Sequence, residues 1–596
     1  MKKTFLFGMA VLLSAAALNA SAQNLDDISA QWGKVLLSSG DKCATTGNQL
    51  IKGNDGLYML AVADTKTAED KITFGDTEIA NGVNYTGSSY NGNFILTKLS
   101  TSGDVMWTVK SVGGEAYQNE QYGAVTADGG VVVACKVRQT EGYETSDVKF
   151  VDAQGHTTSL NFVLDSVNAP RHYQMVVMKV SASGAIEWLK SFKQNDDPQP
   201  EASSTYAKNT ETGIYVYDLV TDDQGNIYVG GRIATTMTIT KADGTTVDLV
   251  PHNVTGWNGS PTKSVGNAFI LKFDANGNYL DNLMTGGSST YDAVRALRYV
   301  NGKLYAGIFV KGLANTAVTL GDKSLTTARA YLSLGTACVN TDLKTVDYFK
   351  LYESSLSSSA FSNLGMRVEG DNIYYTAAAK LKITVDGTTY KTPSSRNGVI
   401  FKVDATTGKL VKFYNNTGYF AGYFDSFLDA EDNLYVAGWA KLEGATTITK
   451  FNAETLVPQD TIEIFPYTAT AQNLIADGKN LYLFTQVKGN DLTSSKVRAK
   501  TPFTITATSL SAMVSGWTLP FNVPVTGIVD VKQPVAVAKV FGTEGALHVV
   551  ANEAQLVNVY DLTGRTVARV NAEQGDNTVS LPAGLYIAAG QKVIVR

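Results

Sequence analysis

Apolar and polar residues alternate along most of the chain in short runs that end in glycine-containing turns. Such alternation is typical of antiparallel β-strands that bury one face. Asn-Gly, Asp-Gly and Gly-Gly pairs in the turns favour the positive backbone angles that tight hairpins need. The pattern therefore predicts an all-β fold.

A turn followed by an apolar pair that contains tyrosine recurs along the chain, for example at residues 54–58 (NDGLY) and 224–228 (QGNIY). We call the tyrosine of each copy, or the valine that replaces it, the marker. The markers are Tyr58, Val132, Tyr228, Tyr305, Tyr374, Tyr435 and Tyr482. A second pattern, an apolar run with a lysine before a turn, alternates with the first. Its lysines are Lys98, Lys179, Lys272, Lys402 and Lys450. The alternation predicts a repeated four-stranded antiparallel unit.

Successive markers lie 47 to 96 residues apart, whereas a bare propeller blade needs roughly 40 to 50 residues. Most units therefore carry an insertion, mainly after the marker strand, as in residues 71–91, 147–171 and 237–265. One such sheet cannot bury its face alone, but several packed radially build one core. We predict a seven-bladed β-propeller over residues 23–519. Two segments are candidates for the strand that closes the propeller, namely the segment around Trp32 and residues 515–517.

Three segments also carry a family resemblance. Residues 225–230, 269–277 and 72–76 resemble the repeats of bacterial extracellular propellers found in secreted surface proteins. The resemblance covers about residues 30 to 520. It implies the propeller fold but no particular activity, because one propeller fold hosts many functions.

The first 22 residues have the pattern of a cleavable signal peptide. Lys2 and Lys3 precede an uncharged apolar stretch at residues 5–18, and residues 20–22 (ASA) fit signal peptidase, which is the first expected partner. The apolar stretch is too short to span a membrane, and no later segment approaches the roughly 20 apolar residues required. Cleavage removes two lysines and no acid, so the net charge moves from −5 to −7. An acidic chain argues against nucleic acid as a partner.

Prolines punctuate residues 520–534, which we expect to be a linker, and residues 535–596 alternate strands and turns like a small β-sandwich. Residues 559–565, 581–587 and 592–596 resemble the C-terminal sorting domain of the type IX secretion system of Bacteroidetes. The matching residues are Tyr560, Gly564, Arg565, Pro582, Gly584 and Tyr586. The resemblance implies the type IX translocon as a second partner and a secreted or outer-surface location reached through the periplasm. A purely structural β-cap is the alternative.

Little in the sequence points to catalysis or to a cofactor. The three cysteines and four histidines are too scattered for a disulfide framework or a zinc site. Residues 274–278 begin like a calcium loop, but Tyr279 and Thr285 stand where that motif needs glycine and glutamate. Residues 404–410 are similar to a quinoprotein turn, yet the tryptophan that follows it there is absent here. We predict no metal, no cofactor and no catalytic residue.

Aromatic residues in or beside the insertions are the candidate ligand contacts, since loops on rigid scaffolds often carry function. The predicted residues are Trp257, Tyr85, Tyr90, Tyr419 and Tyr423, with Tyr414, Phe420 and Phe424 close by. We expect a binding protein with a protein or glycan partner. Two alternatives remain, a glycan-cleaving propeller enzyme and a structural surface component. Carboxylates or tyrosines converging on one channel mouth would favour the enzyme, and an aromatic groove without them would favour binding.

Overall fold

A computed structural model of the protein divides into two compact units, residues 1–524 and 525–596, which are described separately. The structure describes residues 25–40, 43–67, 69–81, 91–139, 148–160, 173–193, 214–234, 236–251, 266–287, 291–329, 331–385, 387–392, 396–416, 421–440, 445–465, 470–489, 507–523, 537–551, 555–561, 566–589 and 591–596. These residues form strands and turns with one short 3₁₀ helix, η1 (Leu25–Asp27). The all-β prediction is confirmed.

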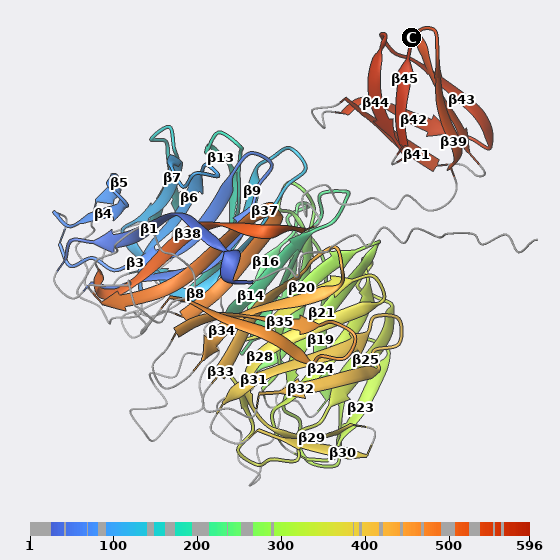
Figure 1. The fold of residues 1–596 in the computed structure, drawn as a ribbon. Coiled ribbons are helices and arrows are strands. Elements are labelled where there is room, and N and C mark those ends of the chain that lie inside the picture. The colour runs from blue at the N-terminus through green and yellow to red at the C-terminus, as the bar shows by residue number, and fades with distance from the viewer. Residues whose placement is uncertain are drawn as a thin grey trace, which may run out of the picture. The chain divides into compact units, whose positions relative to one another are not determined.

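Four-stranded antiparallel runs recur through the larger unit (Figure 1). The first two are β2 (Thr45–Lys52), β3 (Leu57–Ala63), β6 (Asn91–Leu99) and β7 (Val105–Val112), then β8 (Gly114–Val125), β9 (Val131–Gln139), β12 (Tyr173–Val180) and β13 (Ile186–Lys193). The next two are β14 (Ile214–Thr221), β15 (Ile227–Ile233), β18 (Asn267–Phe273) and β19 (Tyr279–Gly287), then β20 (Ala293–Val300), β21 (Lys303–Val310), β24 (Ser333–Asn340) and β25 (Val346–Tyr352). In each run the marker lies on the second strand.

Two further runs follow, and the chain ends share a last sheet. The runs are β27 (Gly365–Glu369), β28 (Asn372–Lys380), β31 (Asn397–Asp404) and β32 (Leu410–Asn415), with β26 (Ala360–Phe361) beside β28, then β33 (Ala421–Leu428), β34 (Asn433–Ala440), β35 (Ala445–Asn452) and β36 (Pro458–Phe465). The last sheet joins β37 (Thr470–Gly489), β38 (Ala507–Val523) and β1 (Ser29–Ser38).

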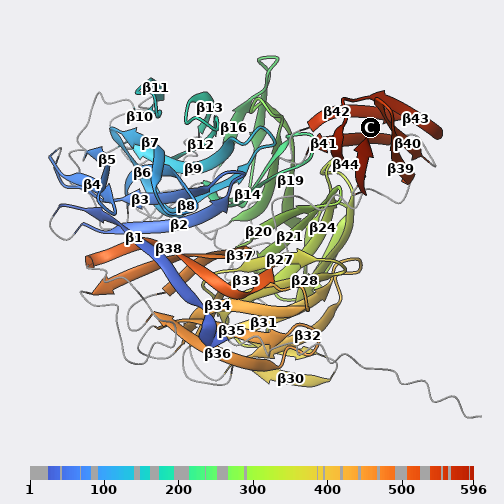
Figure 2. The ribbon, with the colours of Figure 1, turned by 45° about the horizontal axis from the view of Figure 1, so that its top comes forward.

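The pairing of β1 with β38 answers the question of the closing strand. Both candidate segments belong to one sheet, because Trp32 in β1 lies opposite Gly516 in β38. Blue β1 lies beside orange β38 in two views (Figures 1 and 2). The first strand of each run, which we call the inner strand, contacts the next in the cyclic order β2, β8, β14, β20, β27, β33, β37 and back to β2.

Short hairpins occupy the positions where insertions are predicted. They are β4 (Lys71–Phe74) with β5 (Thr77–Asn81), β10 (Val148–Val151) with β11 (Thr157–Leu160), β16 (Met237–Thr240) with β17 (Thr246–Leu249), β22 (Thr316–Leu320) with β23 (Lys323–Thr327), and β29 (Lys382–Val385) with β30 (Thr388–Lys391). Three of them extend the sheet of the preceding run, since β4 pairs with β1, β10 with β7 and β22 with β19. The insertions therefore connect neighbouring runs.

The two sequence patterns meet as cross-strand neighbours. A marker tyrosine lies directly opposite a repeated lysine in the pairs Tyr58–Lys98, Tyr228–Lys272, Tyr374–Lys402 and Tyr435–Lys450. In these pairs the ammonium group lies 5.5 to 5.8 Å from the ring centroid, which is a cation–π distance. The lysines therefore stabilise each run locally and form no common basic surface.

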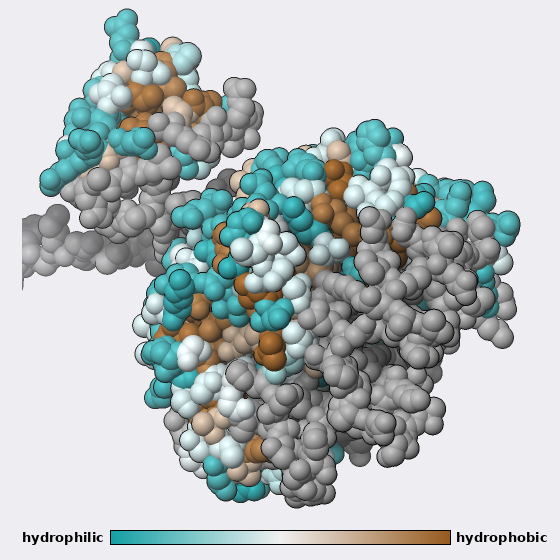
Figure 3. Space-filling view, turned by 180° about the vertical axis from the view of Figure 1, so that it is seen from behind, coloured by the Kyte–Doolittle hydropathy of each residue, from teal (hydrophilic) through white to brown (hydrophobic). Residues whose placement is uncertain are grey.

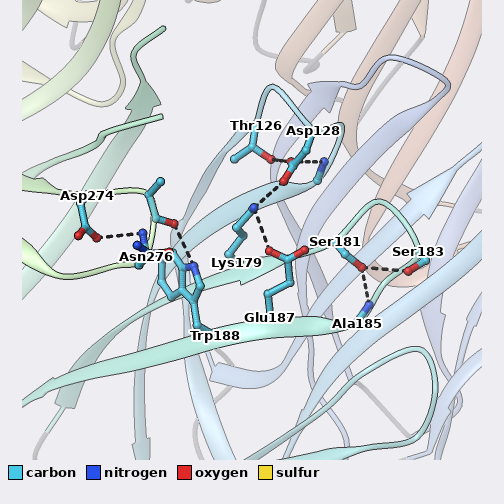
Figure 4. A network of polar contacts seen from close by, with 12 residues as sticks. Thr126, Asp128, Lys179, Ser181, Ser183, Ala185, Glu187, Trp188, Asp274 and Asn276 are labelled. Atoms are coloured by element: carbon cyan, nitrogen blue, oxygen red, sulfur yellow. Dashed lines mark hydrogen bonds and ion pairs between the residues drawn. The ribbon is translucent and has the colours of Figure 1, made fainter. Parts of the chain in front are cut away.

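Where the marker is Val132, the repeated lysine lies opposite this valine and contacts two carboxylates. Lys179 contacts Asp128 at 2.5 Å and Glu187 at 2.9 Å (Figure 4). The next residue along β13, Trp188, donates its ring N–H to the carbonyl of Ala275 at 3.1 Å. Trp32 and Trp107 make the equivalent bond to a carbonyl of the following run. These tryptophans tie each run to its neighbour.

The smaller unit contains two sheets around one apolar core. One sheet has β39 (Val537–Thr543), β40 (Ala546–Ala551) and β43 (Gly575–Ser580), and the other has β42 (Thr566–Ala572), β41 (Gln555–Asp561), β44 (Gly584–Ala588) and β45 (Gln591–Val595). Leu547, Val559 and Ala588 lie in the core. The ring of Tyr586 is 8% exposed, and its hydroxyl donates to the carbonyl of Pro582 at 2.9 Å.

The other residues of the predicted sorting motif are placed only in part. Tyr560 and Gly584 are half-buried, at the ends of β41 and β44. Gly564 and Arg565 lie outside the described residues, as do residues 1–22 and most of 520–534. Strand β38 continues to Val523, four residues past the predicted end of the larger unit at 519.

Candidate ligand-binding pocket

Four of the inner strands contain β-bulges, and each bulge directs one side chain into the same pocket. The register shifts between Gly47 and Gln49 in β2, Val216 and Asp218 in β14, Val294 and Ala296 in β20, and Tyr423 and Asp425 in β33. Each shift leaves one residue without a cross-strand partner, which bends the strand and redirects its side chain. These residues are Asn48, Tyr217, Arg295 and Phe424, and all four line one pocket.

The pocket has a cavity volume of about 540 Å³ and receives residues from every inner strand. Its lining includes five tyrosines, three arginines and three carboxylates: Tyr117, Tyr122, Tyr215, Tyr217 and Tyr291, Arg232, Arg295 and Arg298, and Glu120, Asp218 and Asp425. Amide side chains from β2 and β37 and the ring of Phe424 complete it. A pocket built mainly from strands is held rigidly.

Side chains at the pocket wall link several of the inner strands to their neighbours. Asp218 in β14 accepts the backbone N–H of Leu297 in β20 at 2.8 Å, and Asp425 in β33 accepts that of Leu474 in β37 at 3.2 Å. The remaining links are Gly123 N–H to Gln49 at 2.8 Å, Leu50 N–H to Asn473 at 2.9 Å, and Asn363 to the Tyr423 carbonyl at 2.6 Å. The bond between Leu50 and Asn473 joins the two ends of the larger unit.

Two of the carboxylates have a cationic partner. Asp218, which is 6% exposed, accepts from the guanidinium of Arg298 at 2.8 Å. Glu120 lies 3.7 Å from the buried ammonium of Lys136. Asp425 accepts instead from the amide of Asn473 at 2.6 Å and from backbone N–H groups.

Two arginines lie against tyrosine rings. The guanidinium carbon of Arg232 is 4.0 Å from the ring centroid of Tyr215 and 4.5 Å from that of Tyr291. That of Arg295 is 3.9 Å from the ring centroid of Tyr217. These cation–π contacts hold both guanidinium groups over aromatic rings, and their N–H groups can still donate to other acceptors.

Burial controls the protonation of this site. Burial raises the pKa of Asp218, although Arg298 lowers it in part, and burial also raises the pKa of Asp425. Burial raises the pKa of Tyr122 to about 12 and raises that of Tyr217 further. The two phenols are therefore protonated at neutral pH, and they act as hydrogen-bond donors and not as bases.

The structure removes one predicted contact. Tyr423 is 3% exposed, and its ring packs edge-on against Phe451 with centroids 6.0 Å apart and closes over Gly398. The expectation that this ring is presented to a ligand is wrong, because Tyr423 keeps its place in the β-ladder and faces the core, while the bulged residue after it, Phe424, lines the pocket. Trp257, Tyr85, Tyr90 and Tyr419 lie outside the described residues.

Sequence reasoning missed the inner-strand residues, although a signal exists. Gln49, Asp218, Asp425 and Asn473 each lie nine or ten residues before a marker. A polar side chain at this spacing recurs in four units, and in β14 its neighbours are apolar. The sequence-based prediction chose aromatic residues in or beside the insertions instead.

Other candidate features have local explanations. The carboxylate of Asp274 accepts the backbone N–H groups of Asn276 and Asn278, which closes a turn. Within the described residues no three metal-ligating side chains cluster. All three cysteines are buried thiols outside any disulfide, and burial raises the pKa of Cys338 to about 12. In the described residues we find no helix of sufficient length and apolar character to cross a membrane.

Exposed apolar side chains are dispersed over the larger unit. Met106 in β7, Leu280 in β19 and Val411 in β32 are each about half exposed, and they belong to different sheets. Hydrophilic residues surround small apolar areas on the face seen from behind (Figure 3). Singly exposed apolar residues are normal for a protein surface. The pocket is therefore the stronger candidate site in the described structure.

Comparison with known proteins identifies no family. No family model and no curated protein match the chain. Among solved structures, polysaccharide lyase Uly1 has a TM-score of 0.33 at 9% identity and covers 83% of this chain and 100% of its own. Sqt1 of Saccharomyces cerevisiae has a TM-score of 0.32 at 8% identity and covers 82% of this chain and 98% of its own. A candidate 6-phosphogluconolactonase of Bacteroides fragilis has a TM-score of 0.30 at 14% identity and covers 72% of this chain and 94% of its own. At these values no activity follows.

Proposed function

We propose that the larger unit is a seven-bladed β-propeller and that the protein is a secreted or surface-displayed binding protein which takes a glycan into its central pocket. The pocket at the bulges of the inner strands carries this proposal. The seven-bladed arrangement is supported by the cyclic contacts of the inner strands and by the pairing of β1 with β38.

The partners of the carboxylates favour binding over catalysis. Both tyrosines and carboxylates converge on the pocket, which by itself suits an enzyme. Asp218 and Asp425, however, use their oxygens to hold the backbone of the next inner strand. The phenols of Tyr122 and Tyr217 have raised pKa values. An acid–base mechanism needs a group whose pKa lies near the working pH and whose atoms can reach the substrate.

Size and composition favour a glycan over a protein partner. A cavity of about 540 Å³ lies within the range of roughly 300 to 1,000 Å³ typical of small-ligand sites. Tyrosines combine an apolar ring with a hydroxyl, which suits a sugar with its apolar ring face and hydroxyl rim. Amides and arginines at the same wall supply further hydrogen-bond donors.

Filling the pocket is expected to weaken glycan binding. Ser362 is exposed and lines the pocket, so Ser362→Trp adds a large ring and removes one hydrogen bond, from the serine hydroxyl to the carbonyl of Ala378. Residues 23–596 are applied to a glycan array, and each hit is measured by titration calorimetry. We expect Ser362→Trp to weaken binding at least about tenfold. The matched control, Ser357→Trp, places the same ring at an exposed turn outside the pocket and leaves binding unchanged. No glycan bound, or equal binding by Ser362→Trp, contradicts the proposal.

We also propose that the C-terminal unit directs export across the outer membrane. Its sequence resemblance and its separation from the larger unit support this role. Deleting residues 535–596 is expected to leave the protein in the periplasm, whereas the full chain reaches the surface or the medium. Fractionation and surface proteolysis of cells expressing both forms measure this. If the shortened chain still reached the surface, the export role of the C-terminal unit would be wrong and the unit would have a structural role.

A further inference from the structure

The charges of the pocket wall do not cancel. Two of the three carboxylates are matched by cations, since Asp218 pairs with Arg298 and Glu120 lies beside Lys136. The third, Asp425, is held by an amide and by backbone N–H groups. Burial raises the pKa of Asp425, and the backbone N–H donors and the charges of Arg298 and Arg367 lower it only in part.

Two cations remain for a ligand. Within the described part of the chain, the guanidinium groups of Arg232 and Arg295 form no ion pair and no hydrogen bond to protein, and the Nε atom of each is buried without an acceptor. Both line the pocket. A buried donor without an acceptor is costly, so this wall is prepared for an acceptor that the described protein does not supply.

The tyrosine contacts prepare these arginines for an oxyanion. The guanidinium of Arg232 lies over the rings of Tyr215 and Tyr291, and that of Arg295 lies over the ring of Tyr217. A cation–π contact uses no conventional acceptor, so the N–H groups remain for the bidentate bonds that carboxylates and sulfates accept. A neutral sugar hydroxyl would use one donor at a time.

We infer that the pocket selects an acidic glycan, bearing a carboxylate or a sulfate group that Arg232 and Arg295 bind. This inference rests on the proposed glycan-binding function. The tyrosines contact the sugar ring, and the arginines read its charge. Binding then combines a stacked apolar face with charge-assisted hydrogen bonds.

A matched pair of probes separates charge from shape. Trigalacturonate and its methyl ester differ in the carboxylate alone, and a sulfated galactan tetrasaccharide tests sulfate. We expect residues 23–596 to bind at least one of the two acidic probes. If trigalacturonate binds, its methyl ester should bind at least about tenfold more weakly. Affinity should fall as sodium chloride rises, because charge–charge attraction is screened.

Arginine variants assign the effect to these side chains. Arg295→Met and Arg232→Met keep the apolar stem and remove the charge, and each is expected to weaken acidic-probe binding by about 10- to 100-fold. Arg396→Met changes an exposed arginine outside the pocket and serves as the control. Circular dichroism and the melting temperature verify that each variant folds. Arg295→Lys should recover part of the affinity.

The outcomes distinguish this inference from the function on which it rests. If neutral glycans bind as tightly as acidic ones, and Ser362→Trp blocks binding while Arg295→Met does not, the pocket binds glycans but charge selection is wrong. If no probe and no array glycan binds, glycan binding itself is wrong, and the inference falls with it. An equal loss of affinity for the acidic probe in Arg295→Met and in Arg396→Met would also overturn the inference.

Discussion

Replacing Asp218 with alanine is expected to lower the free energy of unfolding of the larger unit by about 3 kcal/mol. The carboxylate is 6% exposed and accepts from Arg298, from the N–H of Leu297 and from the N–H of Leu219, at 2.8 to 2.9 Å. Alanine removes all three acceptor contacts, leaves two backbone donors unmatched, and leaves the Arg298 guanidinium with the carbonyl of Leu297 and no carboxylate. The effect lies at the low end for a broken buried pair, because the Arg298 side chain is 38% exposed.

Chemical denaturation followed by tryptophan fluorescence measures this loss. Asp218→Asn keeps one acceptor oxygen and should lose less, while Asp76→Ala, at an exposed turn, should unfold like the parent protein. A midpoint for Asp218→Ala equal to that of Asp76→Ala would show that the link between β14 and β20 contributes nothing measurable.

Introducing proline at Leu36 is expected to open the sheet in which the chain ends meet. Leu36 is fully buried in β1, between Ala512 of β38 on one side and Phe74 of β4 on the other. Proline lacks the N–H that an interior strand uses and does not fit between two neighbours, which costs about 3 kcal/mol or more. The lost leucine side chain adds a cavity.

Hydrogen exchange read by mass spectrometry locates the effect. Peptides from β1 and β38 should exchange much faster in Leu36→Pro, and peptides from β20 to β25 should change least. Val411→Pro is the control, because Val411 is exposed in the edge strand β32 beside a register shift. If Leu36→Pro left the exchange of β38 unchanged, the N-terminal strand would not be what closes the larger unit.

Predictions from sequence succeeded where the cause is local. The alternation of marker and lysine patterns predicted strands that the structure pairs directly, as with Tyr58 and Lys98. The Asp-Gly turn at Asp243 lies between β16 and β17 inside a predicted insertion. Turn residues and strand alternation act over a few positions, so they can be read without the fold.

The candidate site was predicted poorly because its residues gain meaning only together. Asp218 and Arg295 stand in separate strands, and neither segment shows that the two side chains share a pocket. Aromatic residues near insertions attracted the prediction instead, and Tyr423 proved to be a core residue. A bulge of one residue decides whether a side chain enters the core or the pocket, and sequence alternation does not reveal it.

By itself, the sequence determined the all-β character, the repeated hairpin units and the places of the inserted hairpins, because these depend on the periodicity and turn chemistry of neighbouring residues. Only the tertiary structure decided which strands close the larger unit and which side chains share the pocket. Those features depend on contacts between distant residues, such as the bond between Leu50 and Asn473, which are 423 positions apart. Contacts over such distances form only when all the sheets pack together, so no local pattern encodes them.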